Sequence, residues 1–264
     1  MVCANGVSAN LVEHTMIDGL TIHEMNAMIR EAIDSHEPGS NGTNGITNGV
    51  SDRSRHDVVL DEYVLTTTPD IESHMNVLRE RYTGYTSKRE YLDFALTNLG
   101  TKVLADHASP IKATFDLTIQ LASRLYFGYN PASWEPVSTA LYHKGRFAIV
   151  QVTTDTVLQF CTSAFDDSIP VPERRNMLLQ AAEDYNSRIR SCYNGNAYFR
   201  LMNAIRSVWP EDEPVAPLFT NPTWLKTHPR LIMSNMTDGG SLDSAYVMGE
   251  TQSIWVSYSV EEAG

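Results

Sequence analysis

The chain has 264 residues, of which 42% are hydrophobic, and this is enough to build one large domain or two small ones around a buried core. Its formal net charge of -12 argues against a nucleic-acid partner, because binding phosphates requires a basic surface. The same charge argues against electrostatic docking on an anionic membrane. No run of about 18 apolar residues predicts a membrane span.

The cysteine pattern predicts reduced thiols. The chain has three cysteines, which are Cys3, Cys161 and Cys192. Their number is odd, they lie far apart, and they form no Cys/His cluster. We therefore expect a cytoplasmic location and no metal site. The first residues also lack the charged start and apolar core of a signal peptide.

The first part of the chain predicts a strand, a helix and an unstructured stretch. Residues 7–12 favour a short strand that runs directly into Glu13 and His14. After Gly19, apolar residues recur at helical spacing and predict a helix over 20–33. Residues 37–55 are rich in Gly, Asn and Ser and nearly free of bulky apolar side chains, so we expect a disordered insertion there.

The rest of the chain alternates between helical and strand patterns. Order is expected to resume at 58–60. Pro69 and Asp70 open a helix whose apolar stripe is Ile71, Met75, Leu78 and Tyr82. Residues 90–96 fit a strand that ends at Gly100 and is followed by a loop, and 255–260 also alternate like a strand. Three more helices are expected over 114–128 (closed by Gly128), 171–193 and 196–208.

This mixture predicts the α/β class. We expect a division into residues 1–36, the disordered linker 37–55, and residues 56–264.

The segment 13–19, EHTMIDG, contains the candidate catalytic residues. His14 follows the expected strand and precedes a turn, where a side chain can face a cleft. An imidazole titrates near neutrality, so it can take a proton from an alcohol or thiol and return it. Asp18 can orient the ring or pair with a nearby arginine. The spacing alone leaves open a structural histidine packed beside a turn.

The chain resembles the choline/carnitine acyltransferases from about residue 6 to residue 258. EHTMIDG is similar to the catalytic EHxxx(E/D)G segment of that family. Four later stretches follow in the family's order: LTNLGTK, TIQLASRLYFG, WEPVSTALYHKGR and NAYFRLMNAI. The resemblance implies a lobe like those of coenzyme A-dependent acyltransferases, with a mixed β-sheet and packed helices.

The resemblance also implies roles for the catalytic residues. His14 would deprotonate the acceptor hydroxyl directly, and the alkoxide would attack the thioester without an acyl-enzyme. Asp18 would be the orienting or structural carboxylate; the alternative is an acid that complements the dipole of a helix start. The family's Ser-Thr-Ser motif reads Met233, Ser234 and Asn235 here. Asn235 would stabilise the oxyanion through its amide, whereas Met233 cannot replace a serine.

The acceptor side differs from the family's pattern. Arg200 falls on the arginine that pairs with the carboxylate of carnitine. Trp134 replaces a tyrosine and Phe147 replaces a threonine, so two hydroxyl donors to that carboxylate are lost. Together with Ser234, these residues are the predicted acceptor-binding set, and the substitutions argue against carnitine as the acceptor.

The donor side differs as well. The family binds the 3′-phosphate of coenzyme A with two lysines four residues apart; Lys102 matches the first, but Asp106 occupies the second position. An acid there would repel phosphate. Lys102 and Ser138 are the predicted donor-binding residues. The co-substrate is expected to be acyl-coenzyme A or an acyl-phosphopantetheine, with no bound cofactor and no metal.

Three functions follow from these features. One is an acyltransferase of the kind fused to reducing polyketide synthases, which moves an acyl chain from a carrier protein to a small-molecule alcohol. The second is a carnitine O-acyltransferase that uses acyl-coenzyme A. The third is an inactive or binding-only lobe, since the family's N-terminal lobe does not precede His14 and would have to be fused or supplied by another chain.

Overall fold

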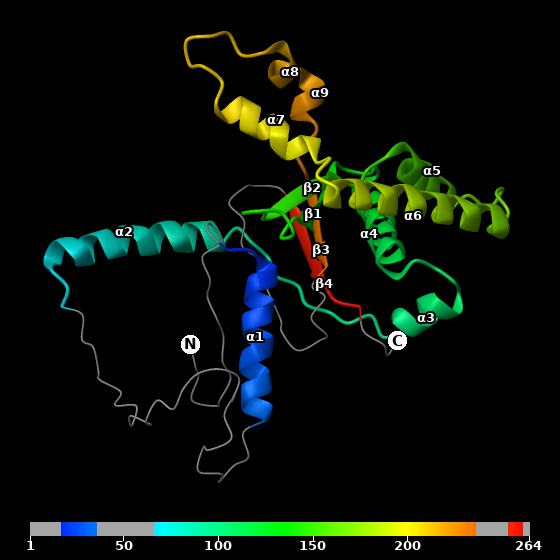
Figure 1. Cartoon of the computed structure of the whole chain (residues 1–264), viewed down its shortest axis with the longest axis horizontal. Coiled ribbons are helices and arrows are strands. Elements are labelled where there is room, and N and C mark those ends of the chain that lie inside the picture. Colours follow the sequence, from blue (N-terminus) through cyan, green and yellow to red (C-terminus); the bar gives the residue numbers. More distant parts are fainter. Residues whose placement is uncertain (1–16, 36–65, 236–252, 261–264) are drawn as a thin grey trace. The chain divides into compact units, whose positions relative to one another are not determined.

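The computed structural model describes residues 17–35, 66–235 and 253–260 (Figure 1). The chain divides into two compact units, one of which joins residues 1–33 to 97–264, while the other runs from 34 to 96. The strand expected at 7–12, the linker expected at 37–55 and the ordered start expected at 58–60 lie outside the described residues. The division of the chain at these points stays a prediction.

A mixed β-sheet lies at the centre of the larger unit. Within the described ranges it contains β1 (Ser133–Ser138), β2 (Phe147–Gln151), β3 (Leu231–Asn235) and β4 (Ile254–Tyr258) in the order β2-β1-β3-β4. The β1–β2 hairpin is antiparallel, and β3 runs parallel to both β1 and β4. The β1–β3 pairing is short, because only Ser133 and Trp134 of β1 face partners on β3.

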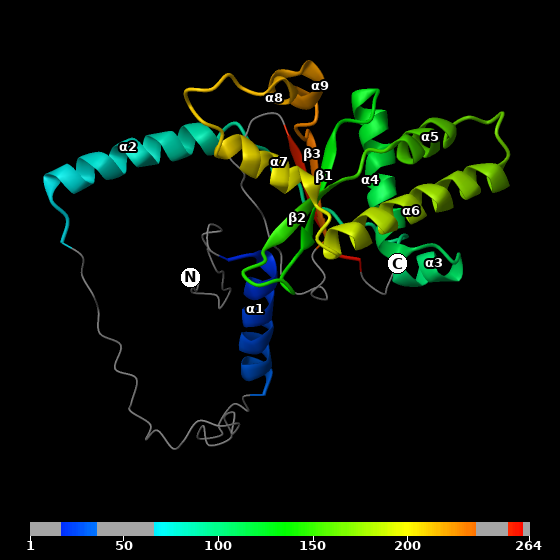
Figure 2. The ribbon, with the colours of Figure 1, turned by 45° about the horizontal axis from the view of Figure 1, so that its top comes forward.

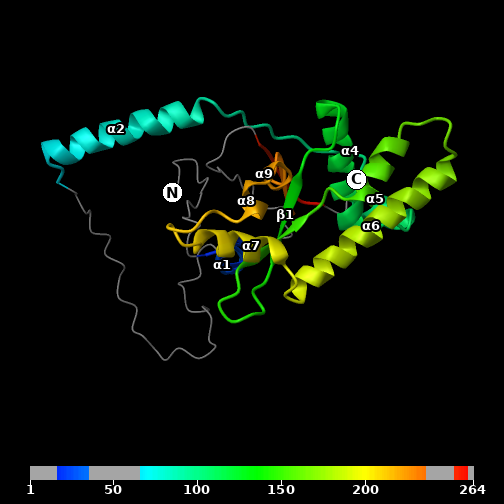
Figure 3. The same ribbon diagram turned by 90° about the horizontal axis from the view of Figure 1, so that it is seen from above.

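The helices lie on both sides of this sheet. In Figures 2 and 3, α4 (Ile111–Phe127), α5 (Asp155–Ser163) and α6 (Val171–Tyr193) gather on one side. On the other side lie α7 (Tyr198–Ser207), α8 (Pro217–Thr220) and α9 (Pro222–Leu225). The remaining helices of this unit are α1 (Gly19–Asp34) and α3 (Thr101–Asp106), and α3 packs on α4.

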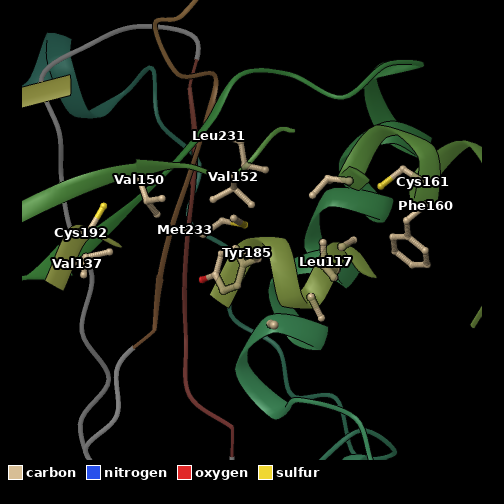
Figure 4. Close-up of a cluster of buried hydrophobic side chains, with 14 of the residues drawn as sticks. Leu117, Val137, Val150, Val152, Phe160, Cys161, Tyr185, Cys192, Leu231 and Met233 are labelled. Carbon is tan, nitrogen blue, oxygen red and sulfur yellow. The ribbon is translucent and has the colours of Figure 1, made fainter. Parts of the chain in front are cut away.

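Two hydrophobic clusters hold these layers together. The larger one fills the space between the sheet and α4–α6, and Figure 4 shows its members. They include Leu117, Val137, Val150, Val152, Val157, Phe160, Tyr185, Leu231 and Met233. The smaller cluster is aromatic: Phe199, Phe219 and Trp224 are buried, and Trp134 and Trp209 pack against them. Alternate residues of β1 and β2 therefore reach two different cores, as the period-2 geometry of strands requires.

The expected α/β class, with helices packed on a mixed sheet, is confirmed. All five helices expected from apolar periodicity are present as α1, α2 (Pro69–Thr86), α4, α6 and α7, and the strand expected at 255–260 is β4. Gly128 ends α4 in the left-handed region with φ +77°, as its C-cap position predicted. None of the helices within the described ranges combines the length and the hydrophobicity that crossing a bilayer requires.

The strand expected at 90–96 is wrong. These residues have no regular structure, and Tyr91, Leu92 and Phe94 are all exposed. An extended segment becomes a strand only when a neighbour takes up its backbone hydrogen bonds, and none of the four described strands pairs with this segment. The loop expected after Gly100 is also wrong in part, because α3 begins at Thr101.

The second unit contains α2 among its described residues. The helix begins at Pro69, whose missing amide hydrogen suits the first turn, and the Thr68 hydroxyl accepts a hydrogen bond from the backbone amide of Ile71 at 3.3 Å. Asp70 and Glu72 lie in the first turn, where negative charge complements the helix dipole.

Candidate active site

The last acid of the EHTMIDG segment forms an ion pair with the β1–β2 hairpin. Asp18 lies directly before α1, and its carboxylate oxygen Oδ1 accepts hydrogen bonds from Arg146 Nη2 at 2.7 Å and Arg146 Nε at 3.2 Å. Arg146 also donates to the carbonyl of Ile17 at 3.4 Å. Since Arg146 precedes β2 immediately, these bonds hold the start of α1 against the sheet.

Asp18 also has the features of a helix-start acid. Its backbone carbonyl accepts hydrogen bonds from the amides of Thr21 and Ile22, so it occupies the position before the first turn of α1. Its carboxylate nevertheless reaches Arg146, 128 residues further along the chain. Asp18 can therefore both complement the dipole at the start of α1 and pair with an arginine.

Arg200 lies close to this ion pair. It projects from the first turn of α7, and its guanidinium carbon lies 4.0 Å from the centre of the Phe147 ring, which is a cation–π contact. The pKa of Arg200 is lowered overall. Partial loss of solvation and the positive charge of Arg146 lower it, and they outweigh the negative charge of Asp18, which raises it. Arg200, Arg146 and Asp18 thus form one group of charges at the start of β2.

An open pocket of about 250 Å³ lies beside this group. Arg200 and Phe147 line it, together with Thr139 and Tyr142 of the hairpin and Cys192 at the end of α6. The Tyr142 hydroxyl donates a hydrogen bond to the carbonyl of Tyr193 at 2.9 Å, so the hairpin is held to the end of α6. A pocket with apolar walls and one guanidinium suits a small molecule that carries polar oxygens.

The hairpin is tight where it reaches the pocket. A Cβ atom on Gly145 would lie 1.9 Å from the backbone oxygen of Thr139, so no side chain fits there. Lys144 adopts a positive φ of 53° just before it. Because of this tight turn, Arg146 contacts Asp18 and the next residue, Phe147, contacts Arg200.

Trp134 lies apart from the pocket. Its ring contacts Phe199 edge-on, with 4.3 Å between the ring centres, and its indole nitrogen donates to the carbonyl of Thr227 at 3.1 Å. Ser138, the last residue of β1, pairs directly with Phe147 of β2. Ser138 therefore ends β1 directly before Thr139, which lines the pocket, whereas Trp134 lies in the aromatic cluster. The donor-binding role of Ser138 stays a prediction.

A second group of charges is buried on the opposite side of β1. Asp116 of α4 and Glu135 of β1 are almost fully buried, and Lys112 lies between them, donating to Asp116 at 2.8 Å and also to Glu135. Tyr185 of α6 contacts both acids, at 2.5 Å for Asp116. Tyr258 of β4 donates to the other oxygen of Asp116. We call these five residues the buried network.

The buried network holds two acids and one base. Burial raises the pKa of Asp116, against the opposing effects of Lys112 and Tyr258. Burial and the charge of Asp116 raise the pKa of Glu135 to about 8. Burial alone would lower the pKa of Lys112, but the two carboxylates outweigh it and raise that pKa. At neutral pH the two acids therefore retain a proton between them, which balances the network's charge.

The strand that carries the predicted oxyanion residue is β3. Met233 is fully buried in the main core, where Gln120 approaches its sulfur at 3.9 Å, so it serves packing. Ser234 is half-buried and pairs with Ser257 of β4. Asn235 ends the strand opposite Tyr258. The catalytic role of Asn235 and the binding role of Ser234 stay predictions.

A comparison with known families agrees with the order of the sequence motifs. The sequence model of the choline/carnitine O-acyltransferases matches residues 1–263. The chain belongs to the choline/carnitine acyltransferase family. His14, its predicted general base, lies outside the described residues, four positions before Asp18.

The relatives of this family member are of two kinds. It is 41% identical over 270 residues to the highly reducing polyketide synthase ltbA of Aspergillus luteorubrus, covering 99% of this chain and 8% of that protein. It is 28% identical to the highly reducing polyketide synthase 17 of Metarhizium anisopliae, covering 84% of this chain and 7% of that protein. It is 24% identical to the peroxisomal carnitine O-octanoyltransferase of Bos taurus, covering 85% of this chain and 36% of that enzyme.

The chain therefore spans less than a tenth of each synthase and about a third of the octanoyltransferase.

The donor-side residue Lys102 lies on α3, away from the pocket-lining elements. Lys102 and Asp106 are both exposed and stand four residues apart on this short helix, which packs on α4. Asp106, which occupies the family's second lysine position, is thus on the same helix as Lys102. No group of three His, Cys, Asp or Glu side chains within the described ranges is arranged to hold a metal ion.

Sequence reasoning missed Arg146 and the buried network. Arg146 lies inside the WEPVSTALYHKGR stretch that carries the family resemblance, but nothing local indicates its partner, which is 128 residues away. The buried network had a weak signal in the sequence, because Lys112 and Asp116 are one helical turn apart. Asp116 also falls on the apolar face of α4, between Ala113 and Leu117. An acid at such a position requires a buried partner.

Proposed function

We propose that this chain is the acyl-transfer domain of a larger protein, and that it moves an acyl group from a thioester to an alcohol with His14 as the general base. The observation that carries this proposal is the ion pair between Asp18 and Arg146 beside the pocket of Arg200 and Phe147. It holds the end of the EHTMIDG segment next to a cavity where an acceptor can bind.

The proposed reaction is a single transfer. The imidazole of His14 takes the proton of the acceptor hydroxyl, and the alkoxide oxygen attacks the thioester carbonyl. The amide of Asn235 stabilises the negative oxygen of the tetrahedral intermediate. Collapse of that intermediate breaks the carbon–sulfur bond, and the departing thiolate takes the proton back from the imidazolium. Asp18 acts indirectly, by fixing the backbone that follows His14.

We propose that the donor is an acyl chain on the phosphopantetheine of a carrier protein. Such a donor has no 3′-phosphate, so it has no need of a second lysine on α3, where Asp106 lies exposed. The names of the polyketide synthase relatives support the same donor class, since the most similar of the three relatives above is one of them. The two described cysteines, Cys161 and Cys192, are buried free thiols, which supports a reaction in the cytosol.

A carnitine O-acyltransferase is the second candidate. Arg200 favours it, because its guanidinium reaches the pocket and could pair with a carboxylate on the acceptor. Phe147 opposes it, because its ring lies against that guanidinium where the family has a hydroxyl donor. A polyol or similar alcohol with an apolar body therefore fits this pocket better than carnitine does.

The test compares acyl-coenzyme A, its 3′-dephospho form and acyl-pantetheine as donors to the complete protein that contains this chain. A charge-assisted bond to phosphate contributes about 1.5–3 kcal/mol, so an enzyme that recognises the phosphate would prefer coenzyme A by one to two orders of magnitude. We expect kcat/KM values within about threefold of each other, because the energy of that bond is absent.

A large preference for coenzyme A over its dephospho form, together with use of carnitine, would establish the second candidate instead. Absence of transfer from every donor to every alcohol would indicate the binding-only lobe. If the three donors are equivalent, Asp106→Lys should create a preference for the phosphate, and Asp93→Lys, which changes charge at an exposed position outside α3, should not.

A further inference from the structure

The position of Asn235 depends on β4 more than on the rest of the sheet. Strand β1 pairs with β3 only at Leu231 and Ile232, the first two residues of β3. Among the described strands, β4 is the partner of Met233, Ser234 and Asn235, which lie opposite Val256, Ser257 and Tyr258. Any shift of β4 would therefore move the end of β3, and with it the residue proposed to stabilise the oxyanion.

β4 is an outer strand of the sheet as far as it is described, and Tyr258 links it to the helix layer. Its hydroxyl donates to Asp116 Oδ1, and its ring stacks on Phe115 with 4.4 Å between the ring centres and 29° between the planes. Both partners are consecutive residues of α4. One side chain at the end of β4 thus makes a polar and an aromatic contact with the same turn of one helix.

Asp116 is itself held rigidly. It is fully buried, and its second oxygen accepts hydrogen bonds from Lys112 at 2.8 Å and Tyr185 at 2.5 Å. Lys112 and Tyr185 both contact Glu135 of β1 as well. A buried carboxylate that loses one donor is costly, so the geometry around Asp116 resists displacement of Tyr258.

We infer that Tyr258 is a positioning residue for acyl transfer, which sets the place of Asn235 by tying β4 to α4 through its contacts with both Asp116 and Phe115. The inference rests on the proposed oxyanion role of Asn235. A displacement of the order of 1 Å in a catalytic group can cost about 100-fold in rate. Loss of one tie, with the strand pairing intact, should cost less.

The test replaces Tyr258 by phenylalanine in the complete protein. Tyr258→Phe keeps the ring that stacks on Phe115 and removes the hydroxyl. We expect kcat to fall about tenfold while KM for donor and acceptor stays within about twofold, because the tie acts on a group used in the transition state. Thr156→Val is the matched control, since it removes a hydroxyl that donates to Asp184 at 2.9 Å between α5 and α6. It should leave kcat unchanged.

A double-mutant cycle with Asn235→Ala identifies the route of the effect. If Tyr258 acts through Asn235, then Tyr258→Phe lowers kcat in the native background and has no further effect after Asn235→Ala. The same factor in both backgrounds, or no loss in either, would overturn the inference while leaving the oxyanion role intact. An unchanged kcat for Asn235→Ala alone would instead refute the oxyanion role, and the inference with it.

A second variant covers the case in which Tyr258→Phe does not fold. Phe115→Leu removes the stacked ring and leaves every hydrogen bond of Asp116 in place. We expect a loss of about threefold in kcat, again absent in the Asn235→Ala background. Wild-type kcat in folded Phe115→Leu protein would overturn the inference.

Discussion

The two sides of the sheet use charged residues in opposite ways. On the helix-covered side, Glu135 belongs to the buried network, where each charge or hydroxyl is satisfied by another member of the network. On the other side of the sheet, the hairpin presents Arg146 and Phe147, and α7 presents Arg200, next to an open pocket. The sheet therefore serves stability through side chains on one side, and the proposed chemistry takes place beside residues of the hairpin, β2 and α7.

The difference lies in solvent access more than in the kind of residue. In the buried network two acids and one base balance only by retaining a proton, so its members cannot be changed singly without cost. At the pocket, the ion pair of Asp18 and Arg146 is partly exposed and adds little to stability. Substitutions on the two sides should therefore separate loss of stability from loss of transfer.

The largest expected effect on stability comes from Lys112. Lys112→Met keeps a long unbranched apolar side chain but removes the ammonium group that lies between the buried acids Asp116 and Glu135. We expect the free energy of unfolding to fall by about 3 kcal/mol, measured by urea denaturation. Lys102→Met removes an exposed lysine and should change it by less than about 0.5 kcal/mol. Equal effects of the two variants would mean that the network does not depend on its lysine.

The pH dependence of unfolding tests the retained proton. The pKa of Glu135 is raised to about 8 in the folded protein, against an ordinary value of 4.5. Between these two values the folded state binds a proton that the unfolded state has released. The free energy of unfolding should therefore decrease as pH rises from about 5 to about 8, by at most about 1.4 kcal/mol per pH unit from this group. Glu135→Gln should flatten that slope; an unchanged slope would assign it to other groups.

On the pocket side, Arg146→Ala should lower transfer with little loss of stability. Without Arg146, Asp18 no longer holds the start of α1 to the sheet, and we expect kcat to fall about tenfold. The free energy of unfolding should change by less than about 1 kcal/mol, because the pair is partly exposed. Arg146→Lys should restore part of the rate, since it keeps the charge and loses the two-nitrogen contact. A fully active Arg146→Ala protein would show that catalysis does not depend on the ion pair.

The smallest expected effect concerns Trp134. Trp134→Phe keeps a ring against Phe199 but removes the hydrogen bond to the carbonyl of Thr227. Leaving that carbonyl without its donor should lower the free energy of unfolding by about 1 kcal/mol in thermal or urea denaturation. A neutral result would show that water replaces the indole at this carbonyl.

Helices with long apolar stripes could be predicted from sequence, and the central strands could not. α4 and α6 repeat apolar residues over four to six turns, a signal that tertiary contacts only reinforce. β1 has the sequence SWEPVS, in which a proline and an inward-facing glutamate hide the alternation. Pro136 is tolerated because it lies beyond the two residues that pair with β3. Residues 90–96 alternate well, but no strand in the described part of the chain pairs with them, so the pattern alone gave a wrong prediction.

Part of the candidate site could be predicted from the sequence, and the rest could not because it depends on contacts between distant residues. Motif residues such as Asp18, Phe147 and Arg200 could be assigned from the family resemblance, and the structure brings these three together. Arg146 and Tyr258 could not be assigned, because their importance lies in contacts with Asp18 and Asp116, more than a hundred residues away in each case. Such pairings follow from the order of strands, which the sequence does not display.

The most direct test of the central claim, that transfer takes place on the pocket side and depends on the EHTMIDG segment, uses His14. His14→Ala and the control His143→Ala, which changes an exposed histidine of the hairpin, are measured for acyl transfer and for unfolding in the complete protein. We predict a loss of about 10²–10⁴-fold in kcat for His14→Ala alone, with the free energies of unfolding of both variants close to wild type. Near-wild-type turnover by His14→Ala would contradict it.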